Sequence, residues 1–142
     1  MDSAAALLYL ARMPFAVTVD YPAMLVTSAW HGGIASSDLT AYIDAVWNDS
    51  RVRGYCELLD FREVVRVDVT SDDIHALAAY SRSHDSPAVP VGTALVAGDQ
   101  LVYGLSRMFA SVRALEPGDL REIRVFTELD AAYLWLRGFR TG

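Results

Sequence analysis

The sequence predicts a single α/β domain whose mixed, mostly parallel sheet of about five strands carries four helices. Segments with the two-residue period of strands alternate along the chain with segments that have the period of helices. With 142 residues and no long stretch rich in Pro, Gly or Ser, the chain has the length of one domain. Its hydrophobic share of 53% is enough to fill a core without disulfides or metal ions.

The first residues are set apart from this domain. Residues 4–11 are apolar, but they are much shorter than the roughly 20 residues of a membrane span. They follow an Asp instead of basic residues, and no small-residue cleavage pattern comes after them. We therefore predict an N-terminal extension over residues 1–13, containing a short helix that packs on the domain or on a second copy, and a domain over residues 14–142. An overextended start codon is the alternative.

Two strands open the predicted domain. Apolar residues alternate with small or polar ones over residues 15–21, which is typical of a half-buried strand. Pro22 interrupts the pattern and residues 24–30 resume it, so we expect an antiparallel hairpin. We expect Gly32 and Gly33 to end the second strand.

A helix and a buried strand follow the hairpin. Residues 38–47 carry apolar side chains at positions i, i+3, i+4, i+7 and i+8, and one of two preceding serines can cap this helix. Residues 55–61 form an apolar run that Glu57 interrupts and Asp60 closes. A run of this kind is typical of a parallel strand that is buried on both faces and has its polar end at the rim of the sheet.

The remaining segments continue the alternation. In chain order they are a helix capped by Thr70 or Ser71, a proline-containing loop over residues 83–90, a strand over 91–97, a helix from Asp99 to a stop at 117–118, a strand over 122–126 and a helix capped by Thr127. In the longest helix the residues expected to face the core are Leu101, Leu105, Met108, Phe109 and Val112. The order ββαβαβαβα predicts parallel neighbours joined by right-handed crossovers, with one antiparallel contact in the opening hairpin.

Composition and motifs exclude several classes of function. A net charge of -6 repels phosphate backbones, so we expect no nucleic-acid partner, and we expect no membrane insertion. The single cysteine, Cys56, rules out an internal disulfide and is expected to be buried, which fits a cytoplasmic protein. His31, His75 and His84 lack the spacing of metal ligands. No phosphate-binding loop or nucleophile elbow occurs, so we expect no metal, no cofactor and no enzymatic activity.

Two small groups of polar side chains are the candidate site residues. Asp60, Arg62 and Asp68 stand near the carboxyl end of the third strand, the edge where open α/β sheets bind ligands. An ion pair and a turn are the structural alternative for them. Tyr103 and Arg107 are four residues apart on a helix and share a face, although Tyr103 would equally suit packing against a neighbouring helix.

This element order, together with Asp60-Phe61-Arg62-Glu63-Val64 and Val67-Asp68-Val69-Thr70-Ser71, resembles the STAS or SpoIIAA-like domains. The resemblance covers residues 14–137 and includes the strand at 93–97 that leads into the helix at 101–108. It implies a non-enzymatic, phosphorylation-controlled partner protein. The phosphorylated serine of that pattern directly follows the aspartate, where this chain has Val69. Thr70 and Ser71 come next, and could either receive a phosphate or serve as plain helix caps.

Two hypotheses about function follow, and an enzyme of unrecognised type is the remaining alternative. The first is a non-enzymatic regulatory or interaction module that offers the region around Thr70 and Ser71 to an unknown protein partner, as a homodimer or a small assembly. The second is a protein that binds a small apolar or lipid-type ligand, since the resembling layout is shared with lipid-carrying domains. In that case Trp30, Trp47, Tyr103 and Met108 are the candidates to line a cavity.

Overall fold

The computed structural model of the chain describes residues 13–85 and 87–139. The predicted extension, apart from its last residue, lies outside the described residues. The elements, in chain order, are β1 (Phe15–Asp20), β2 (Leu25–Ala35), α1 (Ser36–Tyr42), β3 (Cys56–Asp68), α2 (Ser71–Ser83), β4 (Val91–Val96), α3 (Gln100–Arg113), β5 (Arg121–Phe126) and α4 (Leu129–Arg137). This is the predicted order.

The strands form one sheet in the order β1-β2-β3-β4-β5. β1 pairs with β2 in an antiparallel ladder, and the other neighbours are parallel. Cys56, Glu57, Leu58 and Leu59 at the start of β3 are all buried, since helices cover both faces of the sheet at this point. The predicted mixed α/β fold is therefore confirmed.

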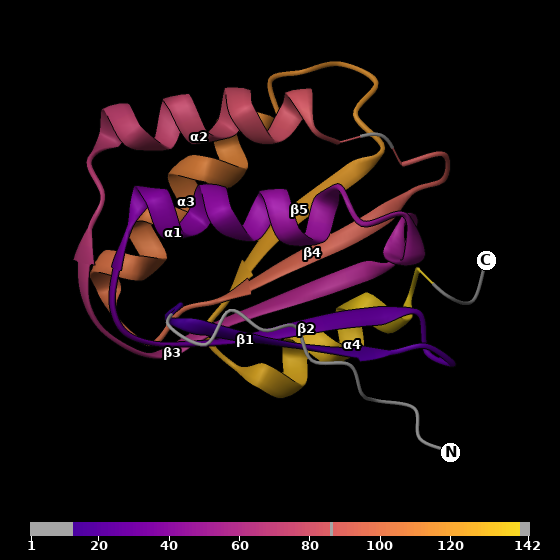
Figure 1. The fold of residues 1–142 in the computed structure, drawn as a ribbon, viewed down its shortest axis with the longest axis horizontal. Coiled ribbons are helices and arrows are strands. Elements are labelled where there is room, and N and C mark those ends of the chain that lie inside the picture. The colour runs from indigo at the N-terminus through magenta and orange to yellow at the C-terminus, as the bar shows by residue number, and fades with distance from the viewer. Residues whose placement is uncertain (1–12, 86, 140–142) are drawn as a thin grey trace.

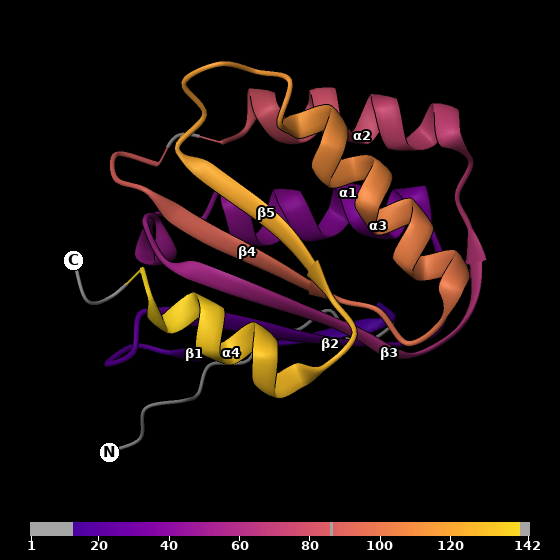
Figure 2. The same ribbon diagram turned by 180° about the vertical axis from the view of Figure 1, so that it is seen from behind.

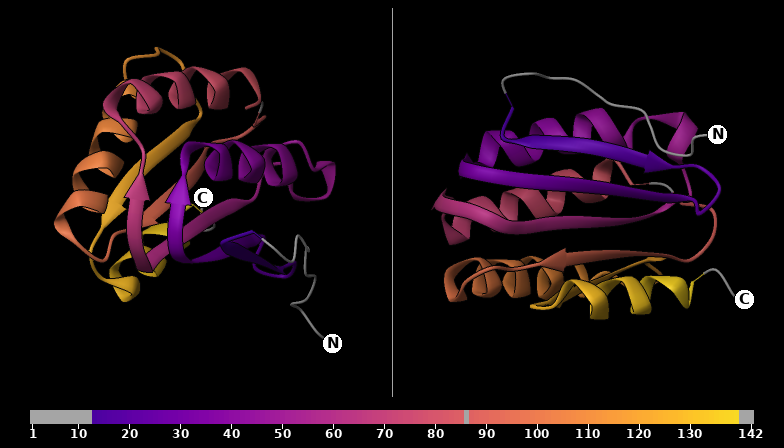
Figure 3. Two further views of the ribbon diagram at one scale, coloured as in Figure 1. Left: turned by 60° about the vertical axis from the view of Figure 1, so that its left-hand side comes forward. Right: turned by 90° about the horizontal axis from the view of Figure 1, so that it is seen from below.

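The helices divide unequally between the two faces of the sheet. α1, α2 and α3 lie on one face and α4 lies on the other (Figure 1, and from behind in Figure 2). α2 packs against α1 and α3 and stands farther from the strands than either of them (Figure 3). The sheet is therefore covered on this face by α1 and α3, and α2 lies over these two helices.

The prediction that Gly32 and Gly33 end the second strand is wrong. β2 continues to Ala35 and stays paired with β3, which itself runs to Asp68. Gly32 adopts a φ of +72°, and the register of the ladder shifts twice, once between Ala29 and His31 and once between Gly32 and Gly33. At each shift β3 has one residue more than β2, and a glycine in the left-handed conformation lets β2 bend and stay paired beside these bulges.

The faces and caps of two helices also differ from prediction. In α3 the buried side chains are Val102, Ser106 and Arg113, whereas Leu101 is 58% exposed. The predicted stripe was therefore displaced by one residue at its start, because buried polar side chains were not counted as inward-facing. α4 is preceded by Glu128 instead of the predicted cap Thr127, and no side chain caps it.

Candidate functional site

An apolar chamber of about 80 Å³ lies between the sheet and the three helices on its more covered face. Its lining residues are Ile34, Leu39, Tyr42, Ile43, Trp47, Glu57, Leu59, Phe61, Val67, Val69, Ile74, Leu77, Thr93, Leu95, Val102, Leu105, Ser106 and Phe109. Leu59, Phe61 and Leu95 of the sheet are buried. The chamber is the candidate functional site because natural interiors are normally packed too densely to leave a space of this size.

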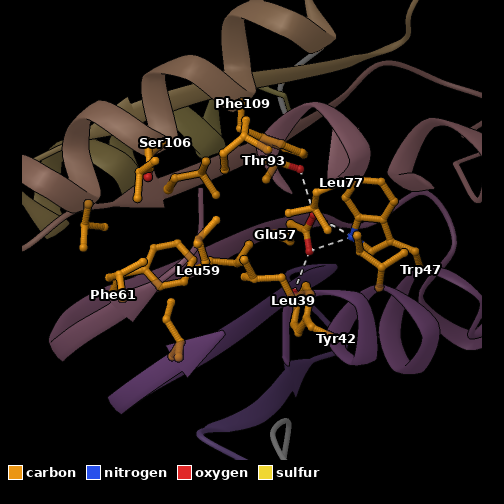
Figure 4. Close-up of a pocket in the computed structure, with 18 residues that line it drawn as sticks. Leu39, Tyr42, Trp47, Glu57, Leu59, Phe61, Leu77, Thr93, Ser106 and Phe109 are labelled. Carbon is orange, nitrogen blue, oxygen red and sulfur yellow. Dashed lines mark hydrogen bonds between the residues drawn. The ribbon is translucent and has the colours of Figure 1, made fainter. Parts of the chain in front are cut away.

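One end of the chamber is closed by the carboxylate of Glu57 (Figure 4). Tyr42 Oη donates to Glu57 Oε2 over 2.6 Å, and Thr93 Oγ1 donates to Oε1 over 2.8 Å. Trp47 Nε1 lies 3.0 and 3.2 Å from the two carboxylate oxygens, and Arg121 Nη1 lies 3.2 Å from Oε1. These contacts occupy the acceptor capacity of the carboxylate, which has about four lone-pair sites.

The local structure of three elements brings these donors together. α1 passes directly into a π-helical turn over Ile43–Trp47, and Trp47 at its end reaches the start of β3. Glu57 and Thr93 are register partners on β3 and β4, and Arg121 begins β5. The polar end of the chamber therefore sits at the amino edge of the parallel strands.

An ionic network extends outward from Glu57. Arg121 makes a paired contact with Asp85, with Nε and Nη2 at 2.8 and 2.9 Å from its two oxygens. Arg113 Nη2 binds Asp85 at 2.8 Å and Asp119 at 2.9 Å. The guanidinium groups of Arg121 and Arg113 both lie over the ring of Trp47, with their Cζ atoms 4.2 and 5.6 Å from its centroid. The network joins β3, β5, α3 and the loop after α2.

Burial and pairing set the charge states in this network. Burial alone would raise the pKa of Asp85, but hydrogen bonds and charge from Arg121, followed by Arg113, hold that pKa below its ordinary value. Burial works against the charge of Arg121, but Glu57 and Asp85 raise its pKa. Burial, with Glu57 adding to it, raises the pKa of Tyr42 well above its ordinary value, so the phenol keeps the proton that it donates.

Ser106 is the other polar side chain on the chamber wall. It lies on α3 and is only 7% exposed, and Figure 4 places it away from Trp47, on the opposite side of Glu57. Its hydroxyl makes no hydrogen bond with any residue between 13 and 139 that the structure describes. The chamber therefore has a saturated polar end and one unused hydroxyl.

The predicted site residues lie elsewhere. Asp60 and Arg62 form an ion pair, with Arg62 Nε and Nη2 each 2.9 Å from an Asp60 oxygen, as the structural alternative expected. Arg62 and Tyr103 line a shallow groove of about 470 Å³ at the carboxyl edge of the sheet. A Cβ at Gly98 in this groove would lie 2.9 Å from the backbone of Arg62, so the close approach of the two segments requires glycine there.

The remaining predicted residues do not join that groove. Asp68 is exposed at the end of β3. Thr70 caps α2, since its hydroxyl accepts the Asp73 N–H at 3.1 Å and Asp73 accepts the Thr70 N–H at 2.9 Å. Ser71 is exposed in the first turn. Arg107 Nη1 donates to Tyr103 Oη over 3.2 Å, so this predicted pair does meet.

The four side chains proposed to line a cavity lie in four different places. Trp47 lines the chamber. Trp30 packs in the core against Phe15, with ring centroids 4.6 Å apart, and donates to Ser28. Tyr103 lines the groove, and Met108 is half-buried on α3 without touching the chamber.

Comparison with known proteins gives information on the fold alone. No family model and no curated protein matches this chain. The chain is similar to an uncharacterized protein of the DUF3478 family from Shewanella loihica PV-4, whose crystal structure has a SpoIIAA-like fold. The similarity covers 94% of each chain, with 13% identity and a TM-score of 0.48. The same fold was predicted from the sequence. A similarity of this size has no bearing on function.

Glu57 and its hydrogen-bonding partners were not predicted as site residues from the sequence. A lone carboxylate inside a strand that is buried on both faces needs hydrogen-bonding partners, and this rule was the available signal. The partners themselves, Trp47, Thr93 and Arg121, come from separate elements and carry no common motif. Among the residues that the structure describes, no acidic, His or Cys cluster suits a metal ion, and no helix is long and apolar enough to cross a membrane.

Proposed function

We propose that the chain is a non-enzymatic binding protein for a small, mainly apolar molecule held in the chamber between the sheet and α1, α2 and α3. The observation that carries this proposal is the unfilled apolar space itself. Concave, mostly apolar sites with few polar groups are the usual form of small-molecule sites. The saturated carboxylate of Glu57 offers no free acceptor to a reacting group, which fits binding without catalysis.

The size and access of the chamber constrain the ligand. The space of about 80 Å³ is roughly half that of engineered cavities that bind benzene. Leu39, Val67, Val69 and Leu105 are half-buried, and they surround the carboxyl-edge end of the chamber. We infer that a ligand enters at this end, because the ionic network occupies the other.

Native mass spectrometry of the freshly purified full chain, compared with its denatured mass, tests the proposal. We expect the native species to carry extra non-covalent mass that Leu77→Phe removes, since the larger side chain fills the chamber from α2. Xenon at several bar should move the methyl resonances of Leu59, Leu95 and Leu105. Methyl groups of Leu58 and Leu136, which lie in the core cluster under α4, serve as the internal control.

Bare chain masses together with unmoved chamber methyl groups under xenon would contradict the proposal. Retained mass that survives Leu77→Phe would contradict the placement in the chamber. If Leu77→Phe fails to fold, Leu105→Phe offers the same test from the half-buried wall on α3.

The second candidate function is the regulatory or interaction module predicted from the sequence. For this module we also propose a cytoplasmic location. Val69 lines the chamber, and the chain continues from it to the capping Thr70 and the exposed Ser71. A partner bound at the start of α2 would therefore contact a segment that touches the ligand. Sedimentation analysis tests the homodimer form of this candidate, which a monomer at about 50 μM would contradict.

A further inference from the structure

We infer that the ligand of the chamber carries one hydrogen-bonding group, a hydroxyl or a carbonyl, and that this group binds the Ser106 hydroxyl. The inference rests on the proposed function and names the chemistry of its ligand. It depends on three observations: an unused hydroxyl, a saturated carboxylate and an otherwise apolar wall between them.

The first observation concerns how serines behave in the helices of this protein. Ser81 on α2 is completely buried, donates to the Ala78 carbonyl over 2.9 Å and accepts from Arg113 Nη1 at 2.8 Å. Ser83, which is exposed, also donates to the Tyr80 carbonyl over 2.8 Å. Buried hydroxyls are satisfied in this way because an unpaired one is costly. Ser106 departs from the pattern, although it is nearly as buried as Ser81.

The second observation concerns the other polar groups of the chamber. Tyr42, Trp47 and Thr93 all donate to Glu57. A ligand could bind these groups only by breaking hydrogen bonds that hold the polar end together, at a large cost in a buried site. Ser106 can donate or accept without breaking any. The polar group of a ligand is therefore directed to α3.

The third observation is the distribution of apolar surface. Leu59, Phe61 and Leu95 of the sheet line the chamber together with Ser106, and Leu77 of α2 adds to this apolar lining. The volume of about 80 Å³ accommodates roughly four or five heavy atoms. These limits describe a short branched chain, or the edge of a ring, with a single hydroxyl or carbonyl.

A pair of probes with the same shape tests the inference. 2-Methylpropan-1-ol and 2-methylbutane differ by one hydroxyl in place of a methyl group, and both can be titrated against the methyl resonances of the full chain. We expect Ser106→Ala to weaken binding of the alcohol roughly fivefold, which is the worth of one net neutral hydrogen bond. We expect the alkane to bind the variant as tightly as the wild type. Ser111→Ala, on the exposed side of the same helix, is the matched control.

The outcomes separate this inference from the proposal beneath it. If Ser106→Ala changes the affinity for neither the alcohol nor the alkane, the role inferred for Ser106 is contradicted and the chamber remains a binding site. If Ser111→Ala weakens the alcohol as much as Ser106→Ala does, the effect belongs to the helix and the inference also fails. If neither probe moves the chamber methyl resonances in the wild type, the proposed function is contradicted.

Discussion

Ser106 has opposite effects on stability and on the proposed binding. The residue is only 7% exposed in the folded chain, and its hydroxyl has no partner among the residues that the structure describes. Residues that serve a site commonly reduce stability in this way, because the interaction they are placed for involves the ligand. The free protein should therefore be more stable without the hydroxyl.

We predict that Ser106→Ala raises the free energy of unfolding by about 1 kcal/mol, since it removes a hydroxyl without a protein partner from a mostly buried residue and places a better helix former in α3. Ser81→Ala should instead lower it by about 1–3 kcal/mol, because Arg113 Nη1 loses its acceptor. Urea unfolding of both variants measures the difference. If Ser106→Ala destabilised the protein as much as Ser81→Ala, the hydroxyl would have a partner inside the protein.

Arg121 shows how single side chains hold separate elements together at the amino edge of the sheet. It contacts Glu57 on β3, Thr93 on β4 and Asp85 in the loop after α2. Its side chain is 9% exposed, and that of Glu57 is 3% exposed. Removing one partner of such a buried group leaves the opposite charges without compensation.

We predict that Arg121→Met lowers the free energy of unfolding by about 3–5 kcal/mol, because Asp85 and Glu57 stay buried with less positive charge nearby. Arg124→Met, three residues along β5, is the control. Its side chain is 54% exposed, so the change should be within about 0.5 kcal/mol. Thermal and urea unfolding give both values. Equal losses in the two variants would show that the network adds nothing beyond an ordinary surface arginine.

Periodicity predicted well those elements that pair or pack without a register shift. β1 shows the predicted alternation, with Phe15, Val17 and Val19 buried, and Thr70 caps α2. The length of β2 was not predictable, because the register shift between Gly32 and Gly33 depends on pairing with β3, which lies far away in the sequence. The local sequence indicates that the chain can bend at a glycine. It does not indicate which strand pairs with the bent segment and keeps it in the sheet.

The candidate site was less predictable than the fold for a related reason. The sequence search favoured polar residues at the carboxyl edge, and Asp60 with Arg62 formed the ion pair given as the alternative. The chamber is a property of packing among α1, α2, α3 and the sheet, and no short segment encodes it. Glu57 was visible as an exception within an apolar run, but its four donors come from positions 42, 47, 93 and 121.

The two ends of the chamber differ in how firmly they are held. At the amino edge, Asp85 joins Arg113 of α3 to Arg121 of β5, and Trp47 lies against the guanidinium groups. At the carboxyl edge, the lining residues Val67, Val69 and Leu105 are apolar and half-buried, and apolar contacts are not directional. A protein built in this way can admit a ligand at one end while the polar end stays fixed.

The fixed end makes the stability of the protein depend on pH. The pKa of Asp85 is lower in the folded chain than the ordinary value near 3.9 that an unfolded chain would have. A carboxyl group whose pKa falls on folding stabilises the protein above its unfolded pKa, and this contribution is lost as the pH falls through the folded pKa. We therefore predict that the free energy of unfolding declines below about pH 4 and that Asp85→Asn flattens this decline.

Asp60→Asn should flatten it less, because the partner of Asp60, Arg62, is exposed to solvent and their interaction is screened. Urea unfolding at several values between about pH 3 and pH 7 measures the slopes, and an unchanged slope in Asp85→Asn would remove Asp85 from the account of acid stability.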